Sequence, residues 1–177
     1  AAEIATTAIE AAKKQFLDIL VALNELEDTY IIFTKANSDV DGRVINSMID
    51  EYVQSNPDNS IAYTSLGQLR YLSAMQFVDG VVGNSSSGLI EAPSFHIGTI
   101  NIGDRQKGRI KAASVIDCLP TYNSIKFALT ELYSVEFNAK LKEVQNPYGE
   151  GGAVEKIISK LKSLPVDNLL KKQFYDM

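Results

Sequence analysis

The stretch of this sequence with the clearest chemical potential is Gly83-Asn84-Ser85-Ser86-Ser87-Gly88. The apolar run before it predicts a short buried strand, and the run that begins at Leu89 predicts a helix. The first N–H groups of a helix lack intrahelical partners and that end is partly positive, so a strand–turn–helix unit built from small residues favours an anion. Gly88 would let the backbone approach a bound group, and the serine hydroxyls add donors. Phosphate or diphosphate is the ligand that we expect.

This turn also has a purely structural alternative, in which Ser85 or Ser86 caps the helix by accepting a hydrogen bond from an orphan N–H. It is not a Walker A loop, because no Lys-Ser or Lys-Thr pair follows Gly88. It is not a nucleophile elbow either, because the pattern Gly-x-Ser-x-Gly is absent. Phosphate binding and helix capping are both open at this point.

Charged residues after the turn extend the candidate site. Glu91 lies one turn into the predicted helix, where its carboxylate suits the vicinal hydroxyls of a sugar or, alternatively, interacts only with the helix dipole. The loop 104–109 follows an apolar run, and its Arg105 and Arg109 suit bidentate hydrogen bonds to phosphate or to Glu91. A solvated surface loop is the alternative for this segment.

The other candidates favour structural roles. His96 is the sole histidine and lies near a predicted helix end, where a packed or helix-terminal histidine is expected rather than a catalytic base. With that one histidine and the one cysteine, Cys118, we expect no metal site, and we assign no cofactor. The glycine-rich segment 148–152 is interpreted as a turn before a helix, with a second backbone anion site as its alternative.

Composition narrows the class of protein. The 177 residues are 45% hydrophobic and 22% charged, which is typical of an ordinary soluble domain. A net charge of −5 without a long basic cluster argues against nucleic acid and anionic membranes as partners. No long apolar run is present, and the single cysteine excludes an internal disulfide, so we expect a cytoplasmic protein.

Short apolar runs alternate along the chain with segments of helical periodicity. The expected strands are 30–34, 61–63, 81–82, 99–102 and 115–118, and the expected helices are 8–26, 44–53, 68–77, 88–95, 125–133, 154–164 and a tail at 168–174. This alternation predicts an α/β fold, a Rossmann-like parallel sheet with helices on both faces. We divide the chain into a domain at 1–165 and a C-terminal tail helix at 166–177. Ligands bind such sheets at the carboxyl ends of the strands, where Asn37, Ser65, the serine-rich turn and the loop 103–109 would converge.

Three segments together carry a resemblance to a known family. The run 83–95 resembles the signature of UDP-N-acetylglucosamine 2-epimerases, and Asn101-Ile102-Gly103-Asp104-Arg105-Gln106-Lys107-Gly108-Arg109 resembles the version found in the hydrolysing branch. The segment 146–151 resembles the late glycine-rich segment of the family. The resemblance runs over nearly the whole chain, but it covers only the C-terminal half of the two-domain enzyme, whose fold is glycosyltransferase-B-like.

The resemblance implies an enzyme that converts UDP-N-acetylglucosamine and water into N-acetylmannosamine and UDP, or that acts on a diacetamido analogue, for the biosynthesis of sialic-acid-type sugars. UDP is eliminated first, and water then adds to the glycal. The implied UDP-binding residues are Ser85 and Ser86 at the diphosphate, Glu91 at the ribose, Leu66 through its backbone at the uracil, and Arg105 and Asn37 beside the nucleotide.

The sequence departs from the family pattern at its start. The C-terminal half of the family begins with a strand whose histidine reaches the substrate, whereas Glu3-Ile4-Ala5-Thr6 stands at that place here. The acid–base carboxylates belong to the N-terminal half of the family, so we assign no catalytic residue and expect no activity from this half alone. The expected partners are the UDP-sugar and the N-terminal domain, and self-association is left open. His96 replaces a residue that is usually glycine in the family.

The absent first strand has a structural consequence, because that strand is usually central in a doubly wound sheet. Without it, its two neighbours pair with each other or leave a gap with unpaired backbone groups, and a strand recruited from a neighbour could fill that gap. Two other functions remain as alternatives: the nucleotide-binding half of a sugar transferase, and a module that binds a phosphorylated ligand without chemistry.

Overall fold

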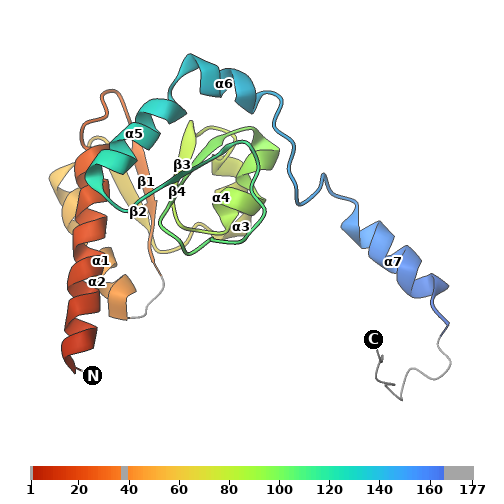
Figure 1. Cartoon of the computed structure of the whole chain (residues 1–177), viewed down its shortest axis with the longest axis horizontal. Helices are drawn as coiled ribbons and strands as arrows, with labels where there is room; N and C mark the ends of the chain where they lie inside the picture. The colour runs from red at the N-terminus through yellow and green to blue at the C-terminus, as the bar shows by residue number, and fades with distance from the viewer. Residues whose placement is uncertain (1, 37–39, 166–177) are drawn as a thin grey trace.

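Five short parallel strands and the helices between them form the body of the chain (Figure 1). The computed structural model describes residues 2–36 and 40–165. The strands are β1 (Ile31–Thr34), β2 (Ser60–Tyr63), β3 (Gly80–Gly83), β4 (Gly98–Ile102) and β5 (Val115–Cys118). The helices are α1 (Ala2–Leu23), α2 (Val40–Ser55), α3 (Gly67–Ala74), α4 (Ser87–Ile90), the 3-10 helix η1 (Ala92–Phe95), α5 (Tyr122–Leu132), α6 (Val135–Leu141) and α7 (Ala153–Ser163). The predicted parallel α/β architecture is confirmed.

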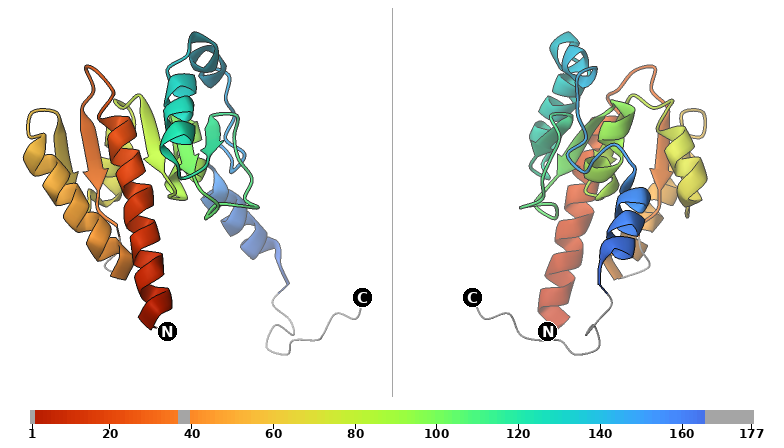
Figure 2. Two further views of the ribbon diagram at one scale, coloured as in Figure 1. Left: turned by 60° about the vertical axis from the view of Figure 1, so that its left-hand side comes forward. Right: turned by 90° about the vertical axis from the view of Figure 1, so that its right-hand side faces the viewer.

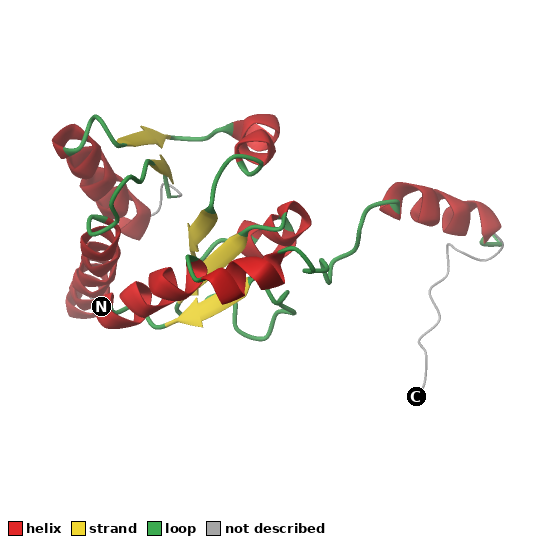
Figure 3. Cartoon of the chain, turned by 90° about the horizontal axis from the view of Figure 1, so that it is seen from above, coloured by secondary structure: helices red, strands yellow, loops and turns green. Residues whose placement is uncertain are grey.

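The strands do not form one continuous sheet. Within residues 2–36 and 40–165, β1 pairs only with β2, while β3, β4 and β5 form a second sheet in that order, and every pairing is parallel. Seen from above in Figure 3, the two groups of strands stand apart. Among the described residues no ladder joins β1 to β3, so of the two stated alternatives the gap is found and the pairing of these two strands is not.

Helices cover the sheets on opposite faces. Side chains alternate along β4, so Ile100 and Ile102 point into a core with α5, while Thr99 points the other way and contacts α4. On the first face α2, α1 and α5 lie side by side, with α1 touching both of its neighbours (Figure 2). The prediction of helices on both faces is therefore confirmed.

α1 spans the gap between the two sheets. Its Leu20 packs in one cluster with Phe33 of β1 and Ile49 of α2. Its Ala22 and Leu23 belong to the larger cluster formed by β4, β5, α5 and α6. Side-chain packing on this helix thus joins the two sheets, whose strands share no backbone ladder.

Most elements lie within a few residues of their predicted positions, with two exceptions inside the described part of the chain. The predicted helix 88–95 is two short helices, because Pro93 has no N–H to donate to the carbonyl four residues earlier. The sequence reading also omitted α6, whose N-cap Ser134 accepts a hydrogen bond from the N–H of Phe137. Residues 3–6 belong to α1, so no strand stands there, as predicted, but the helix begins well before its predicted start at residue 8. The predicted tail helix at 168–174 lies outside the described residues.

α7 lies apart from the body of the molecule, at the end of an extended segment (Figure 1). Every residue from Glu150 to Pro165 is exposed, including the apolar residues of the helix and its C-cap: Val154, Ile157, Ile158, Leu161 and Leu164.

Candidate functional site

The serine-rich turn directly follows the carboxyl end of β3, as the sequence predicts. Ser85 Oγ accepts a hydrogen bond of 3.3 Å from the N–H of Ser87, while the carbonyl of Ser86 accepts from both Leu89 and Ile90. Ser86 is the N-cap residue of α4 but makes no capping hydrogen bond with its side chain. The hydrogen bond from the Ser87 N–H to Ser85 is the capping contact that the structural alternative describes, whereas the hydroxyl of Ser86 makes no such bond. Ser85 is exposed and Ser86 is half-buried.

Gly88 serves the packing of α4 against β4. A Cβ atom at Gly88 would lie 2.5 Å from Cγ2 of Thr99, closer than two carbon atoms can approach. The hydroxyl of Thr99 donates a 2.9 Å hydrogen bond to the carbonyl of Gly88. We had expected the missing side chain to admit a ligand, but Gly88 is buried and the space is taken by Thr99.

The loop after β4 is fastened to the turn after β3. Gln106 Nε2 donates a 2.7 Å hydrogen bond to the backbone carbonyl of Asn84, and Arg105 Nη1 lies 3.4 Å from Oδ1 of the same residue. Gln106 is buried, whereas Arg105 is exposed. The arginine and the serine-rich turn therefore lie at the same edge of the sheet, where the carboxyl ends of β3 and β4 meet.

A second link joins the turn to the helix that follows β2. Ser87 Oγ donates a 2.8 Å hydrogen bond to the hydroxyl of Tyr71 in α3. Burial raises the pKa of this phenol, and the nearby carboxylate of Glu91 raises it further against the opposing effect of Ser87. Glu91 is half-buried at the junction of α4 and η1, and Leu66 is the half-buried N-cap residue of α3.

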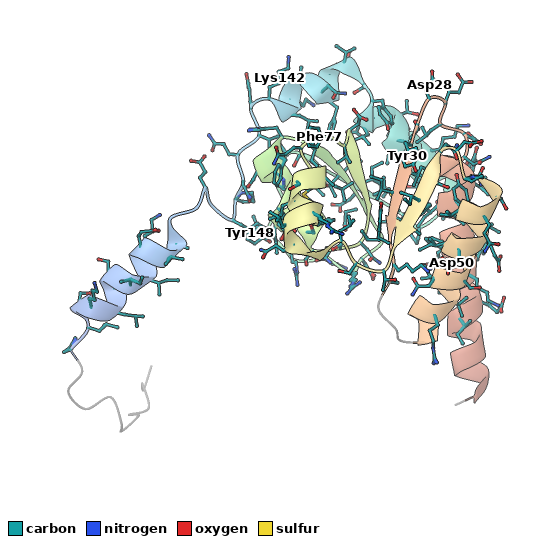
Figure 4. The ribbon with its side chains drawn as sticks, turned by 180° about the vertical axis from the view of Figure 1, so that it is seen from behind. Asp28, Tyr30, Asp50, Phe77, Lys142 and Tyr148 are labelled. Atoms are coloured by element: carbon teal, nitrogen blue, oxygen red, sulfur yellow. The ribbon has the colours of Figure 1, made fainter. Side chains whose placement is uncertain are left out.

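The glycine-rich segment 146–151 is hydrogen-bonded to α4 and η1. Asn146 Nδ2 donates to the carbonyl of Ile90 at 2.8 Å and to Ser94 Oγ at 2.7 Å, while the hydroxyl of Tyr148 donates to the carbonyl of Ile110 at 3.0 Å. Figure 4 shows Tyr148 on the body, near the point where the chain leaves toward α7. These contacts give the segment a bracing role.

His96 has the structural role that the sequence indicates. It ends η1 in the left-handed conformation with φ +55°, a backbone geometry that glycine adopts more readily. Its Nδ1 lies 3.0 Å from the carbonyl of Leu141, which can only accept, so Nδ1 carries the proton.

A polar network ties β5 to the central strand β4. Asp117 Oδ1 accepts hydrogen bonds from Asn101 Nδ2 at 2.7 Å and from Lys111 Nζ at 2.8 Å. Burial raises the pKa of the Asp117 carboxyl, but these donors outweigh it and hold the pKa below its usual value. Burial, and then the charge of Asp117, raise the pKa of the Cys118 thiol to about 11, so this thiol is protonated at neutral pH.

The structure thus brings together five predicted features: Leu66, Ser85, Ser86, Glu91 and Arg105 all lie on segments that follow the carboxyl ends of β2, β3 and β4. Arg105 contacts Asn84 and not Glu91. Asn37 lies outside the described residues. The sequence reading missed Tyr71 and the individual role of Gln106. The sequence feature that could have indicated a special role for Gln106 is its uncharged amide among charged loop residues. No local feature of the sequence indicates a role for Tyr71.

Other kinds of site receive no support from the described part of the chain. No group of three histidine, cysteine, aspartate or glutamate side chains lies close enough to hold a metal ion. Between residues 2–36 and 40–165, no helix is long and apolar enough to cross a membrane. Two open hollows of about 520 and 580 Å³ lie along α1 and α2, and their walls include none of the expected UDP-binding residues.

Comparison with known proteins gives a consistent result. The family model described as UDP-N-acetylglucosamine 2-epimerase matches residues 5–162. The chain is 39% identical over 173 residues to the GDP/UDP-N,N'-diacetylbacillosamine 2-epimerase (hydrolyzing) of Campylobacter jejuni, and 31% identical over 174 residues to the polysialic acid biosynthesis protein P7 of Escherichia coli. Each match covers 97% of this chain, which spans 44% of the length of either relative.

Solved structures show the same fold. The UDP-GlcNAc 2-epimerase of Neisseria meningitidis, solved with UDP-GlcNAc bound, superposes with a TM-score of 0.66 at 19% identity, over 86% of this chain and 41% of that one. The MnaA–UDP co-structure of S. aureus gives a TM-score of 0.65 at 19% identity, over 85% and 40% of the two chains. At this level of identity the likeness concerns the fold alone.

Proposed function

Because the chain belongs to the UDP-N-acetylglucosamine 2-epimerase family, we propose that it is the nucleotide-binding half of a hydrolysing 2-epimerase. Its substrate is UDP-N-acetylglucosamine or a diacetamido analogue, and its product class is an N-acetylmannosamine-type sugar used for sialic-acid-like polymers. The hydrolysing relatives and the polysialic acid protein support this choice. A cytoplasmic location is part of the proposal, in keeping with the free thiol of Cys118.

The observation that carries the proposal is the joining of three loops at one sheet edge. Gln106 and Arg105 fasten the loop after β4 to Asn84 in the turn after β3, and Ser87 fastens that turn to Tyr71 in the helix after β2. A nucleoside diphosphate extends over several side chains, so it requires groups from more than one loop to be held in register.

In the proposed complex, each of these groups contacts one part of the nucleotide. Ser85, Ser86 and the backbone of their turn hold the diphosphate, and the guanidinium of Arg105 supplies positive charge beside it. The carboxylate of Glu91 accepts hydrogen bonds from the ribose hydroxyls. The backbone at Leu66 contacts the uracil, and Asn37 lines the same site.

The chemistry that this half supports is the departure of UDP. Elimination requires a base for the C2 proton of the sugar and stabilisation of the negative charge that grows on the leaving diphosphate. The serine-rich turn and Arg105 provide the second requirement. We assign the base to the remaining part of the enzyme, and we therefore expect the 177-residue chain alone to bind nucleotide without turning over a UDP-sugar.

Isothermal titration calorimetry with UDP, UMP and inorganic phosphate tests the proposal. Selective binding of UDP over UMP and phosphate is the expected result. Equal binding of all three would instead indicate a module for phosphorylated ligands in general, and absence of UDP binding by the complete enzyme would overturn the assignment. Release of N-acetylmannosamine from UDP-N-acetylglucosamine by the complete enzyme distinguishes an epimerase from a sugar transferase.

A further inference from the structure

Gln106 is the one buried residue in the segment 103–109. The loop that follows β4 is rich in charge, and Asp104, Arg105, Lys107 and Arg109 are all exposed, whereas Gln106 is only 3% exposed. Burial of an amide costs free energy unless its polar atoms find partners. The position of this one side chain therefore calls for a physical reason.

The partner of Gln106 is Asn84, the second residue of the serine-rich turn. Its Nε2 donates a 2.7 Å hydrogen bond to the backbone carbonyl of Asn84, across 22 residues of sequence. Arg105, its neighbour, reaches the side-chain oxygen of Asn84 at 3.4 Å. Asn84 is thus held at two atoms by two consecutive residues of the other loop, and Gln106 makes the shorter contact from a buried position.

We propose that Gln106 is a positioning residue of the nucleotide site, which fixes the serine-rich turn and the Arg105 loop relative to each other so that both address one diphosphate. The inference rests on the proposed function in its choice of ligand. Each of the two loops supplies part of the diphosphate contact, so the affinity depends on the geometry between them. Holding that geometry before the ligand arrives removes the cost of ordering the loops on binding.

Stability alone does not account for a glutamine at this position. Oε1 of Gln106 is buried and has no hydrogen-bond partner among the described residues. An unpaired buried acceptor destabilises a fold, and an apolar side chain of the same length would avoid that cost. The donor to Asn84 is what an apolar side chain cannot supply, so its loss is expected to weaken ligand binding while the opposing effects on stability largely offset each other.

The substitution Gln106→Met in the full-length protein separates the two effects, because methionine keeps the length and removes both polar atoms. We expect a melting temperature close to that of the wild type, because removal of the unpaired acceptor offsets the loss of the hydrogen bond to Asn84. By calorimetry the Kd for UDP should rise about tenfold, the effect of losing one well-placed hydrogen bond, while the Kd for uridine changes less than about twofold. Gln54→Met on the exposed face of α2 is the matched control and should leave both constants unchanged.

Hydrogen–deuterium exchange of the ligand-free protein gives a readout that needs no nucleotide. In Gln106→Met, amides of 84–88 and 103–109 should exchange faster than in the wild type, with no change in α2. A second variant, Gln106→Glu, keeps the length but loses the donor when ionised, and it should show the same pattern above neutral pH.

Each outcome decides one of the two claims. Unchanged exchange in both segments, or an equal loss of UDP and uridine affinity together with a lower melting temperature, would overturn the positioning role. If the wild type binds no UDP while Gln106→Met still speeds exchange in both segments, the proposed function fails, and the choice of diphosphate as ligand fails with it. The role of Gln106 in holding the two loops together would stand. If the wild type binds UDP and the variant binds it equally well, only the positioning role fails.

Discussion

Glu91 and Tyr71 lie within electrostatic range of each other beside the serine-rich turn, since the carboxylate contributes to the raised pKa of the phenol. Ser87 donates its proton to the tyrosine oxygen, so the tyrosine keeps its own proton for another acceptor. A half-buried carboxylate, which accepts hydrogen bonds, therefore lies near a half-buried phenol that can donate one, and the proposed ribose contact would use both. A ribose has both functions, because each hydroxyl donates and accepts.

The substitution Glu91→Gln should weaken UDP binding by about 1–2 kcal/mol, because charge-assisted hydrogen bonds to the ribose become neutral ones. Calorimetry with UDP measures the effect, and binding of inorganic phosphate should not change. Glu143→Gln, at an exposed position, serves as the control with the same change of charge. An unaltered affinity for UDP would reduce Glu91 to an acid that interacts only with its helix.

Single residues differ in how far the sequence could predict them. Ser85, Ser86 and Arg105 belong to local runs whose composition already indicates an anion site, and their placement at the sheet edge follows from the order of strands and helices. Tyr71 could not be predicted, because its contact with Ser87 joins two segments 16 residues apart and depends on where α3 lies. The burial of Gln106 likewise depends on the path of a turn 22 residues earlier.

At the scale of elements, the apolar runs predict the positions of the strands well, because a buried parallel strand is a short run of β-branched and other apolar residues. Helix ends were predicted less well. The break between α4 and η1 follows from Pro93, which the sequence displays, whereas the close packing of Gly88 on Thr99 of β4 is a tertiary contact that it does not. The sequence left the gap between β1 and β3 as one of several alternatives, because the pairing of two strands depends on the whole sheet and not on their local sequence.

The packing of α4 on β4 can be tested by adding a single Cβ atom at Gly88. Gly88→Ala should destabilise the fold by about 1–3 kcal/mol, because the new Cβ overlaps Cγ2 of Thr99 and α4 must move away. Chemical denaturation measures the loss. Thr99→Ser removes the methyl group but keeps the hydroxyl that donates to Gly88, so the double variant should recover most of the stability. Additive losses would show that the overlap is not the cause.

The tie between β4 and β5 should depend on pH. Because the pKa of Asp117 is lowered in the folded state, its contribution is present at neutral pH and is lost as the pH falls through the folded pKa, below about 4. Asp117→Asn should therefore cost about 0.5–1 kcal/mol at neutral pH, the range of a partly exposed ion pair, and the difference from the wild type should narrow toward about pH 3. Urea denaturation across this range measures it. A constant difference would point to packing.

At the scale of the whole molecule, the candidate site lies across the gap between the two sheets. Leu66 follows β2 in one sheet, while the serine-rich turn and the Arg105 loop follow β3 and β4 in the other. α1 packs against both sheets, and the hydrogen bond from Ser87 to Tyr71 joins them on the opposite side. The relative position of the residues in the proposed nucleotide site thus depends on these side-chain links rather than on a shared ladder.

The edge of β1 that faces away from β2 allows the gap to be tested. The N–H groups of Ile31 and Lys35 donate to carbonyls beside and at the end of β2, so by alternation those of Ile32 and Thr34 point to the other side. In the 177-residue chain we expect the amides of Ile32 and Thr34 to exchange with solvent much faster than those of Ile31 and Phe33. In the complete enzyme a strand inserted between β1 and β3 should protect all four. Fast exchange at Ile32 and Thr34 in both proteins would exclude such a strand. If these two amides were instead protected in the monomeric 177-residue chain, the gap would already be closed without an added strand.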